Sequence, residues 1–73
     1  MGNNGNWNRI KGNWKQFTGH VQEKWGELTN DEIDEMNGER KQLVGKIQER
    51  YGIAQNEAER QVDEWADNLK ERL

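Results

Sequence analysis

Apolar residues recur every three or four positions through the first third of the chain. The series runs Trp7, Ile10, Trp14, Phe17, Val21, Trp25 and Leu28. That period places all of them along one face of an α-helix, whereas a strand would need alternation by two. The spacing predicts a helix over about residues 6–25, with polar and charged residues on its other face, and leaves open whether it is continuous through Gly12 and Gly19. Gly26 then suits the left-handed position that closes a helix.

A second, shorter helix is predicted directly after this one. Residues 29–32 read Thr-Asn-Asp-Glu, the pattern of a capping box, in which the threonine caps a helix and the glutamate reaches back to it. Ile33 and Met36 have the spacing of inward-facing residues. We expect this helix to end at Gly38, because glycine is a common terminator.

Two further amphipathic helices account for the rest of the chain. One is predicted over residues 39–51 and is closed by Gly52, and the other over residues 55–70. Their inward-facing residues are Leu43, Val44, Ile47 and Tyr51 in the first, and Ala58, Val62, Trp65, Ala66 and Leu69 in the second. The pattern therefore predicts an all-α fold of four or five short helices.

The two halves of the chain are related by an internal repeat with a period of 26 residues. Residues 10–31 match residues 36–57 at eight of 22 positions. The identical pairs are Gly12/Gly38, Lys15/Lys41, Gln16/Gln42, Gly19/Gly45, Gln22/Gln48, Glu23/Glu49, Gly26/Gly52 and Asn30/Asn56. We interpret the repeat as two related α-hairpins that pack together around one core.

Gly19 and Gly45 fall in the middle of predicted helices, where glycine costs about 1 kcal/mol relative to alanine. A helix usually carries that cost where another backbone comes close. We therefore expect the two glycines to mark a close crossing between the long helices of the two halves.

Three segments resemble the CsbD-like stress-response family. They are Gly12-Asn-Trp-Lys-Gln-Phe-Thr-Gly19, Trp25-Gly-Glu-Leu-Thr29 and Gln42-Leu-Val-Gly-Lys-Ile-Gln-Glu-Arg-Tyr-Gly52. The resemblance extends from Trp7 to about Asn68. It implies a fold of two orthogonally packed helical hairpins, and a small, abundant, hydrophilic bacterial protein linked to the general stress response. The family has no established biochemical activity, so the resemblance assigns no functional residues.

Length and composition indicate the number of domains and the compartment that suits the chain. The 73 residues suffice for one domain, which we place at residues 6–73 after a disordered tail at residues 1–5. No cysteine is present, which removes disulfides and thiolate ligands and fits a reducing compartment. No apolar run approaches the roughly 18 residues of a membrane span. We therefore expect a cytoplasmic protein that does not enter the membrane.

Candidate catalytic chemistry is sparse. His20, the single histidine, aligns with Lys46 in the repeat and falls on the polar side of its helix. The many carboxylates lie on charge-rich helix faces, whereas a catalytic pair needs burial to separate its pKa values. We expect no enzyme activity, no cofactor, no metal site and no small-molecule substrate.

Charge is distributed unevenly along the chain. Residues 1–26 carry a net charge of +3 and residues 27–73 a net charge of −6. The basic side chains that would contact nucleic acid are Arg9, Lys11, Lys15 and Lys24. Trp7 and Trp14 interleave with them, as base-stacking residues do on single strands. Both tryptophans nevertheless belong to the apolar stripe, and the overall negative charge opposes phosphate binding, so the core interpretation is favoured.

These observations leave three functional classes. The leading prediction is a non-enzymatic stress-associated protein that acts by binding a partner, which the sequence does not identify, or as an abundant protectant. The alternative is weak nucleic-acid binding through the basic face of the first helix. The charge asymmetry also permits weak, salt-sensitive self-association of an otherwise monomeric chain.

Overall fold

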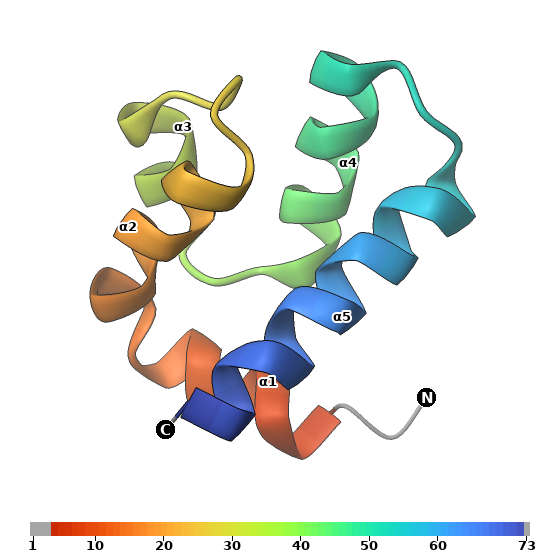
Figure 1. Cartoon of the computed structure of the whole chain (residues 1–73). Coiled ribbons are helices and arrows are strands. Elements are labelled where there is room, and N and C mark those ends of the chain that lie inside the picture. The colour runs from red at the N-terminus through yellow and green to blue at the C-terminus, as the bar shows by residue number, and fades with distance from the viewer. Residues whose placement is uncertain (1–3, 73) are drawn as a thin grey trace.

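The computed structural model describes the backbone of residues 4–72 and the side chains of residues 7–69. Within this part of the chain there are five α-helices and no strand, which confirms the all-α fold class (Figure 1). The helices are α1 (Asn4–Gly12), α2 (Trp14–Lys24), α3 (Asn30–Glu35), α4 (Arg40–Tyr51) and α5 (Gln55–Arg72). Most of the tail predicted at residues 1–5 lies outside the described residues, so the domain boundary stays a prediction.

The helical segment predicted over residues 6–25 is not continuous, because it is broken directly after Gly12, at Asn13. This residue, with φ −119° and ψ 36°, separates α1 from α2. Its side-chain amide donates to the backbone carbonyl of Arg9 at 3.0 Å, a local bond that competes with regular helix. The apolar stripe thus continues across two helices, and α1 packs against both α2 and α5.

The internal repeat corresponds to a repeat of structure. A shift of 26 residues places α2 (Trp14–Lys24) over residues 40–50, almost the whole of α4 (Arg40–Tyr51). Each of these helices packs against the helix that follows it, α2 against α3 and α4 against α5 (Figure 1). The repeat also aligns Asn13 with Glu39, the N-cap of α4, so the break in the first helix is the boundary that the second half also has. The orthogonal angle between the two hairpins stays a prediction.

Local signals predicted some of the helix ends. The end predicted at Gly38 is wrong, because α3 ends three residues earlier, at Glu35. Thr29 caps α3, and its side chain and that of Glu32 form the complete capping box. Gly52 ends α4 in the left-handed conformation, with φ +65°. The left-handed conformation predicted for Gly26 is wrong, because α2 ends instead at Trp25, which has φ −121°. Trp25 is buried, so core contacts rather than a glycine turn set this end.

The core contains every residue of the predicted apolar stripes except Tyr51, which is 40% exposed. Its buried members are Trp7, Ile10, Trp14, Phe17, Val21, Trp25, Leu28, Ile33, Met36, Leu43, Val44, Ile47, Ala58, Val62, Trp65, Ala66 and Leu69. Among the described residues, no polar or charged side chain is buried with them. The structure therefore places its ionisable groups on the surface.

Four tryptophans connect the helices inside this core. Trp65 of α5 lies 6.1 Å from Trp7 and 5.4 Å from Trp25 between ring centroids, and Trp7 lies 6.3 Å from Trp14. Three indole N–H groups reach acceptors far away in sequence, since a buried donor without a partner is costly. Trp7 donates to the Gly38 carbonyl at 2.8 Å, Trp14 to the Ile33 carbonyl at 2.8 Å, and Trp25 to the Gln61 side chain at 3.0 Å.

Gly38 lies where α1 meets the connection between α3 and α4. It has φ +81°, and a Cβ at this position would lie 2.9 Å from the Cα and Cγ atoms of Lys11. Only glycine fits both the backbone conformation and this approach. The carbonyl that accepts the Trp7 indole belongs to the same residue.

Gly38→Ala is expected to lower the free energy of unfolding by about 2–3 kcal/mol, since it adds both left-handed strain and a backbone clash. Gly52→Ala is the matched control, because Gly52 is also left-handed but a Cβ there would meet nothing within 4 Å. Urea titrations should show a smaller loss for the control. Equal losses would contradict a role for the contact with Lys11.

The close helix crossing predicted at Gly19 and Gly45 is wrong. A Cβ built at either glycine meets nothing within 4 Å, and both residues are exposed. The two glycines face away from the core, so no neighbouring backbone within the chain explains them.

Gly19→Ala and Gly45→Ala are each expected to raise the free energy of unfolding by roughly 0.5–1 kcal/mol, because alanine loses less backbone entropy in a helix and has free space here. Thermal and urea unfolding of both single variants and of the pair measure this. A loss of stability in either variant would contradict the open surroundings of its glycine.

Candidate functional site

The four predicted nucleic-acid contacts lie on the surface of the first two helices. Arg9 and Lys11 project from α1, Lys15 and Lys24 from α2, and all four are exposed. Lys11 and Lys15 line one open depression of about 690 Å³, which the junction of α1 and α2 forms with α3. Asp34 and Glu35 line the same depression, and Lys11 is paired with Glu39 at 2.9 Å. Carboxylates therefore offset much of the positive charge at this end.

Lys24 lies apart from the other three. Nine residues of helix separate it from Lys15, about 14 Å along the axis. Its ammonium is 6.0 Å from the ring centroid of Trp25, and it lines a different depression of about 250 Å³ between α2 and α5. His20 and Glu64 are in the wall of that depression. The structure brings two of the predicted contacts to one depression and leaves the set as a whole dispersed.

Trp7 and Trp14 are core residues, as the favoured interpretation predicted. Their exposed fractions are 8% and 7%, and both indole N–H groups are bonded to buried backbone carbonyls. A base could not stack on either ring without opening the core. Nucleic-acid contact through this region would depend on the basic side chains alone.

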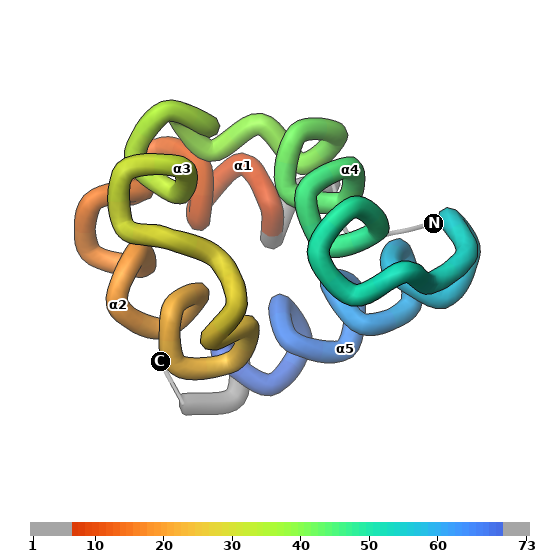
Figure 2. The backbone as a smooth tube through the Cα atoms, turned by 90° about the horizontal axis from the view of Figure 1, so that it is seen from above, coloured from red at the N-terminus to blue at the C-terminus, as the bar shows by residue number. Residues whose placement is uncertain are grey.

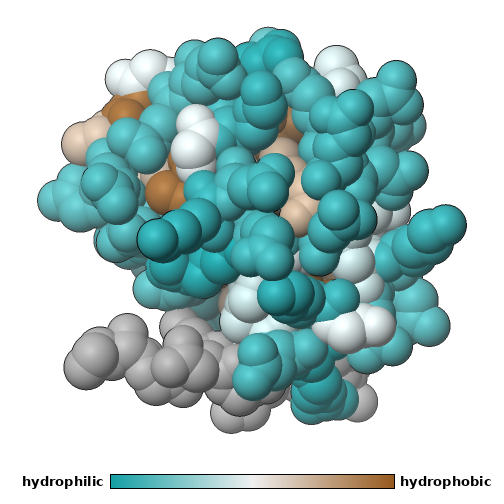
Figure 3. All heavy atoms as spheres, turned by 180° about the vertical axis from the view of Figure 1, so that it is seen from behind, coloured by the Kyte–Doolittle hydropathy of each residue, from teal (hydrophilic) through white to brown (hydrophobic). Residues whose placement is uncertain are grey.

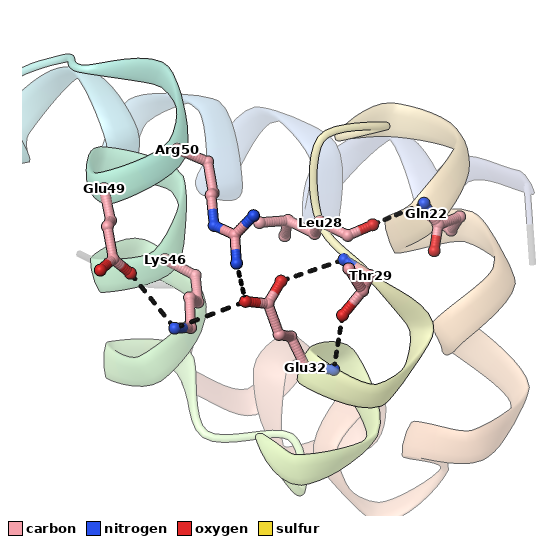
Figure 4. A network of polar contacts seen from close by, with 7 residues as sticks. All are labelled: Gln22, Leu28, Thr29, Glu32, Lys46, Glu49 and Arg50. Atoms are coloured by element: carbon pink, nitrogen blue, oxygen red, sulfur yellow. Dashed lines mark hydrogen bonds and ion pairs between the residues drawn. The ribbon is translucent and has the colours of Figure 1, made fainter.

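Glu32, the predicted capping-box glutamate, is the centre of a polar cluster whose contacts with α4 the sequence pattern did not reveal (Figure 4). One carboxylate oxygen accepts the backbone N–H of Thr29 at 3.0 Å, which completes the capping box. The other pairs with two cations of α4, Arg50 and, at 3.6 Å, Lys46. Lys46 also reaches Glu49 at 3.2 Å. This Glu32 network joins α3 to α4 across the boundary between the two halves.

The network changes the acidity of its central group. The pKa of Glu32 is lowered, first by the backbone N–H of Thr29 and then by the charges of Arg50 and Lys46, against an opposing effect of partial burial. The carboxylate is therefore held in its ionised form.

A second set of polar contacts fixes the loop between α2 and α3. Gln22 donates from its side chain to the carbonyl of Leu28 at 2.6 Å (Figure 4). The Tyr51 hydroxyl, at the end of α4, accepts the backbone N–H of Glu27 at 3.1 Å. Gln22 and Tyr51 both belong to the segment that the repeat shares, which is the sequence signal for these contacts. Their partners are not readable from the repeat.

The surface of the described residues is otherwise mainly polar. Figure 3 shows one face covered mainly by hydrophilic residues, with only small separate hydrophobic areas. Among the described residues, no three His, Asp or Glu side chains are placed to hold a metal ion together. In the same part of the chain, no helix has the length and apolarity needed to cross a membrane.

Comparisons with known proteins give a consistent result. A sequence model of the CsbD-like family matches residues 8–60. The UPF0337 protein RPA4217 of Rhodopseudomonas palustris is 55% identical over 64 residues, which are 88% of this chain and 97% of the relative. The UPF0337 protein YjbJ of Escherichia coli is 55% identical over 54 residues, 74% of this chain and 78% of the relative. No solved structure matches the chain.

Glu32→Gln is expected to destabilise the fold at neutral pH, because it removes the charge that faces Arg50 and Lys46. Since the pKa of Glu32 is lowered on folding, its contribution is fully present above about pH 4.5 and is lost as the pH falls through the folded-state pKa. The stability difference between wild type and variant should therefore shrink in acid. Unfolding measured across this pH range tests it.

Glu35→Gln is the control for this prediction. It removes the same charge from the same helix, at an exposed residue that forms no ion pair within the described part of the chain. An equal effect of the two substitutions at neutral pH would show that the Glu32 network adds nothing beyond general charge.

Proposed function

The chain belongs to the CsbD-like family, and we propose that it is a non-enzymatic, stress-associated small protein that acts on other macromolecules through its charged surface. Binding of a discrete partner and protection by bulk abundance are the two forms of this function. They differ in stoichiometry, because a binding site saturates and a protectant acts only near equal amounts.

The distribution of ionisable groups supports this proposal above other observations. Every described ionisable side chain is exposed or only partly buried, and the buried residues are all hydrophobic apart from Gly38. Catalytic acids and bases depend on burial to shift their pKa values. A surface of solvated charges instead suits contacts with other macromolecules.

Nucleic-acid binding is the second candidate, and one observation favours it. Arg9, Lys15 and Lys24 make no ion pair within the described part of the chain, so their charges remain available to phosphate. Lys11 is engaged with Glu39. Such binding would be weak, sequence-independent and strongly salt-dependent.

A crosslinked pulldown of the tagged chain from stressed and unstressed cells, with and without nuclease, separates these functions. The companion variant carries Arg9→Gln, Lys15→Gln and Lys24→Gln together. We expect wild type and variant to recover the same partners after nuclease, because the proposed function does not depend on phosphate contacts.

Partners that vanish with nuclease, or with the triple substitution, would establish the nucleic-acid alternative in place of the proposal. Recovery of no specific partner, together with protection of a client enzyme only near equal amounts, identifies the protectant form. Turnover of a small molecule by the purified chain would contradict the proposal altogether.

A further inference from the structure

The helices α2 and α4 carry the same row of exposed residues. In each, a lysine, a glycine and a glutamate follow one another at intervals of four residues, on successive turns of one face. The rows are Lys15, Gly19 and Glu23 on α2, and Lys41, Gly45 and Glu49 on α4. Each row thus has a positive end, a negative end and no side chain at its centre.

No contact within the described part of the chain explains the glycine at the centre of either row. Glycine weakens a helix, and such a residue is usually kept where another backbone approaches. At Gly19 and Gly45 an added Cβ would meet no atom within 4 Å, and neither residue has the positive φ that would require glycine. A backbone that approaches either glycine must therefore belong to another molecule.

The surroundings of Gly45 indicate which helix would approach. Gly45 lines a groove of about 280 Å³ between α3 and α4. Its other walls include the carboxylates of Glu32, Glu35 and Glu49, which outnumber the two cations that pair with two of them, Lys46 in the groove and Arg50 beside it. The excess of carboxylates favours a helix of net positive charge, and α2 carries Lys15 and Lys24 against Glu23.

We propose that the chain self-associates head to tail, with α2 of one copy docked in the α3–α4 groove of the next. The two helices run antiparallel and cross where Gly19 meets Gly45. At the common crossing angle near −50°, rows of residues four apart run alongside each other. Lys15 then lies beside Glu49 of the next copy, and Glu23 beside its Lys41.

The arrangement of α2 and α4 determines the form of this assembly. The two helices lie on opposite sides of the molecule (Figure 2). A contact between α2 of one copy and α4 of another leaves a free α4 and a free α2 at the two ends, so such a contact extends into chains. Exposed ion pairs are weak and screened by salt, so the association is favoured at high protein concentration and low ionic strength.

Sedimentation velocity of the full chain over a wide concentration range tests the proposal. At low salt we expect the average mass to rise with concentration beyond that of a dimer, and to return to the monomer value at high salt. Gly45→Leu should abolish the rise, because a side chain there fills the crossing point. Leucine is a good helix former and its Cβ would meet nothing within 4 Å at this exposed position, so we expect the fold to be retained, as circular dichroism would check.

Charge reversal tests the pairing itself. Lys15→Glu and Glu49→Lys should each lose the association, and an equimolar mixture of the two variants should regain it, because every contact between unlike variants pairs opposite charges again. Asp67→Lys, an exposed acidic residue of α5 with no place in the contact, is the control for Glu49→Lys and should associate like wild type.

Three results would overturn the proposal. The first is a wild-type chain that remains monomeric at every concentration at low salt. The second is Gly45→Leu that associates as wild type does. The third is insensitivity to Lys15→Glu, which would mean that any association uses a surface other than α2.

Discussion

The fold depends on the need of a buried indole N–H for a hydrogen-bond acceptor. Burying tryptophan gives a small chain much apolar contact area, yet each ring brings a donor that must not be left without a partner. Trp7 meets this need at the carbonyl of Gly38, 31 residues away. The bond holds α1 against the connection between α3 and α4, and the contact is close enough that position 38 has no room for a Cβ. One hydrogen bond thereby fixes the first helix on the second half.

Three tryptophans meet this need with uncharged acceptors. Trp14 and Trp25 also find acceptors in distant segments. The Trp7 bond joins α1 to the connection after α3, the Trp14 bond joins α2 to α3, and the Trp25 bond joins the end of α2 to α5. The described ionisable groups are left at the surface, where the Glu32 network links α3 and α4. Apolar contacts thus bring the halves together and surface charges align them.

Glycine serves different purposes at different positions in this structure. Gly38 is required by its backbone conformation and by a close neighbour. Neither a positive φ nor a close neighbour requires glycine at positions 19 and 45. Both lie on the surface, in rows that also contain lysine and glutamate. Charged groups at the surface give a protein specificity through their relative positions. The two identical rows on α2 and α4 place such charges in a defined order.

The sequence by itself determined the all-α class, all but one of the inward-facing residues, the capping box of α3, the left-handed end of α4 and the repeat. All of these follow from residues within a few positions of one another, or from the comparison of one half with the other. The surface position of Arg9, Lys11, Lys15 and Lys24 also followed from periodicity. The repeat even contained the break at Asn13, since it aligns that residue with the N-cap of α4.

Only the tertiary structure decided which surfaces meet. It brought Lys11 and Lys15 to one depression and Lys24 to another, paired Glu32 with Arg50 and Lys46, and placed Gly19 and Gly45 against open space. The reason is physical. The period of the apolar residues indicates which face of a helix is buried, and this depends only on residues close together in sequence. The partner of that face, and the charges that come to lie together on the other, depend on how helices far apart in sequence are packed.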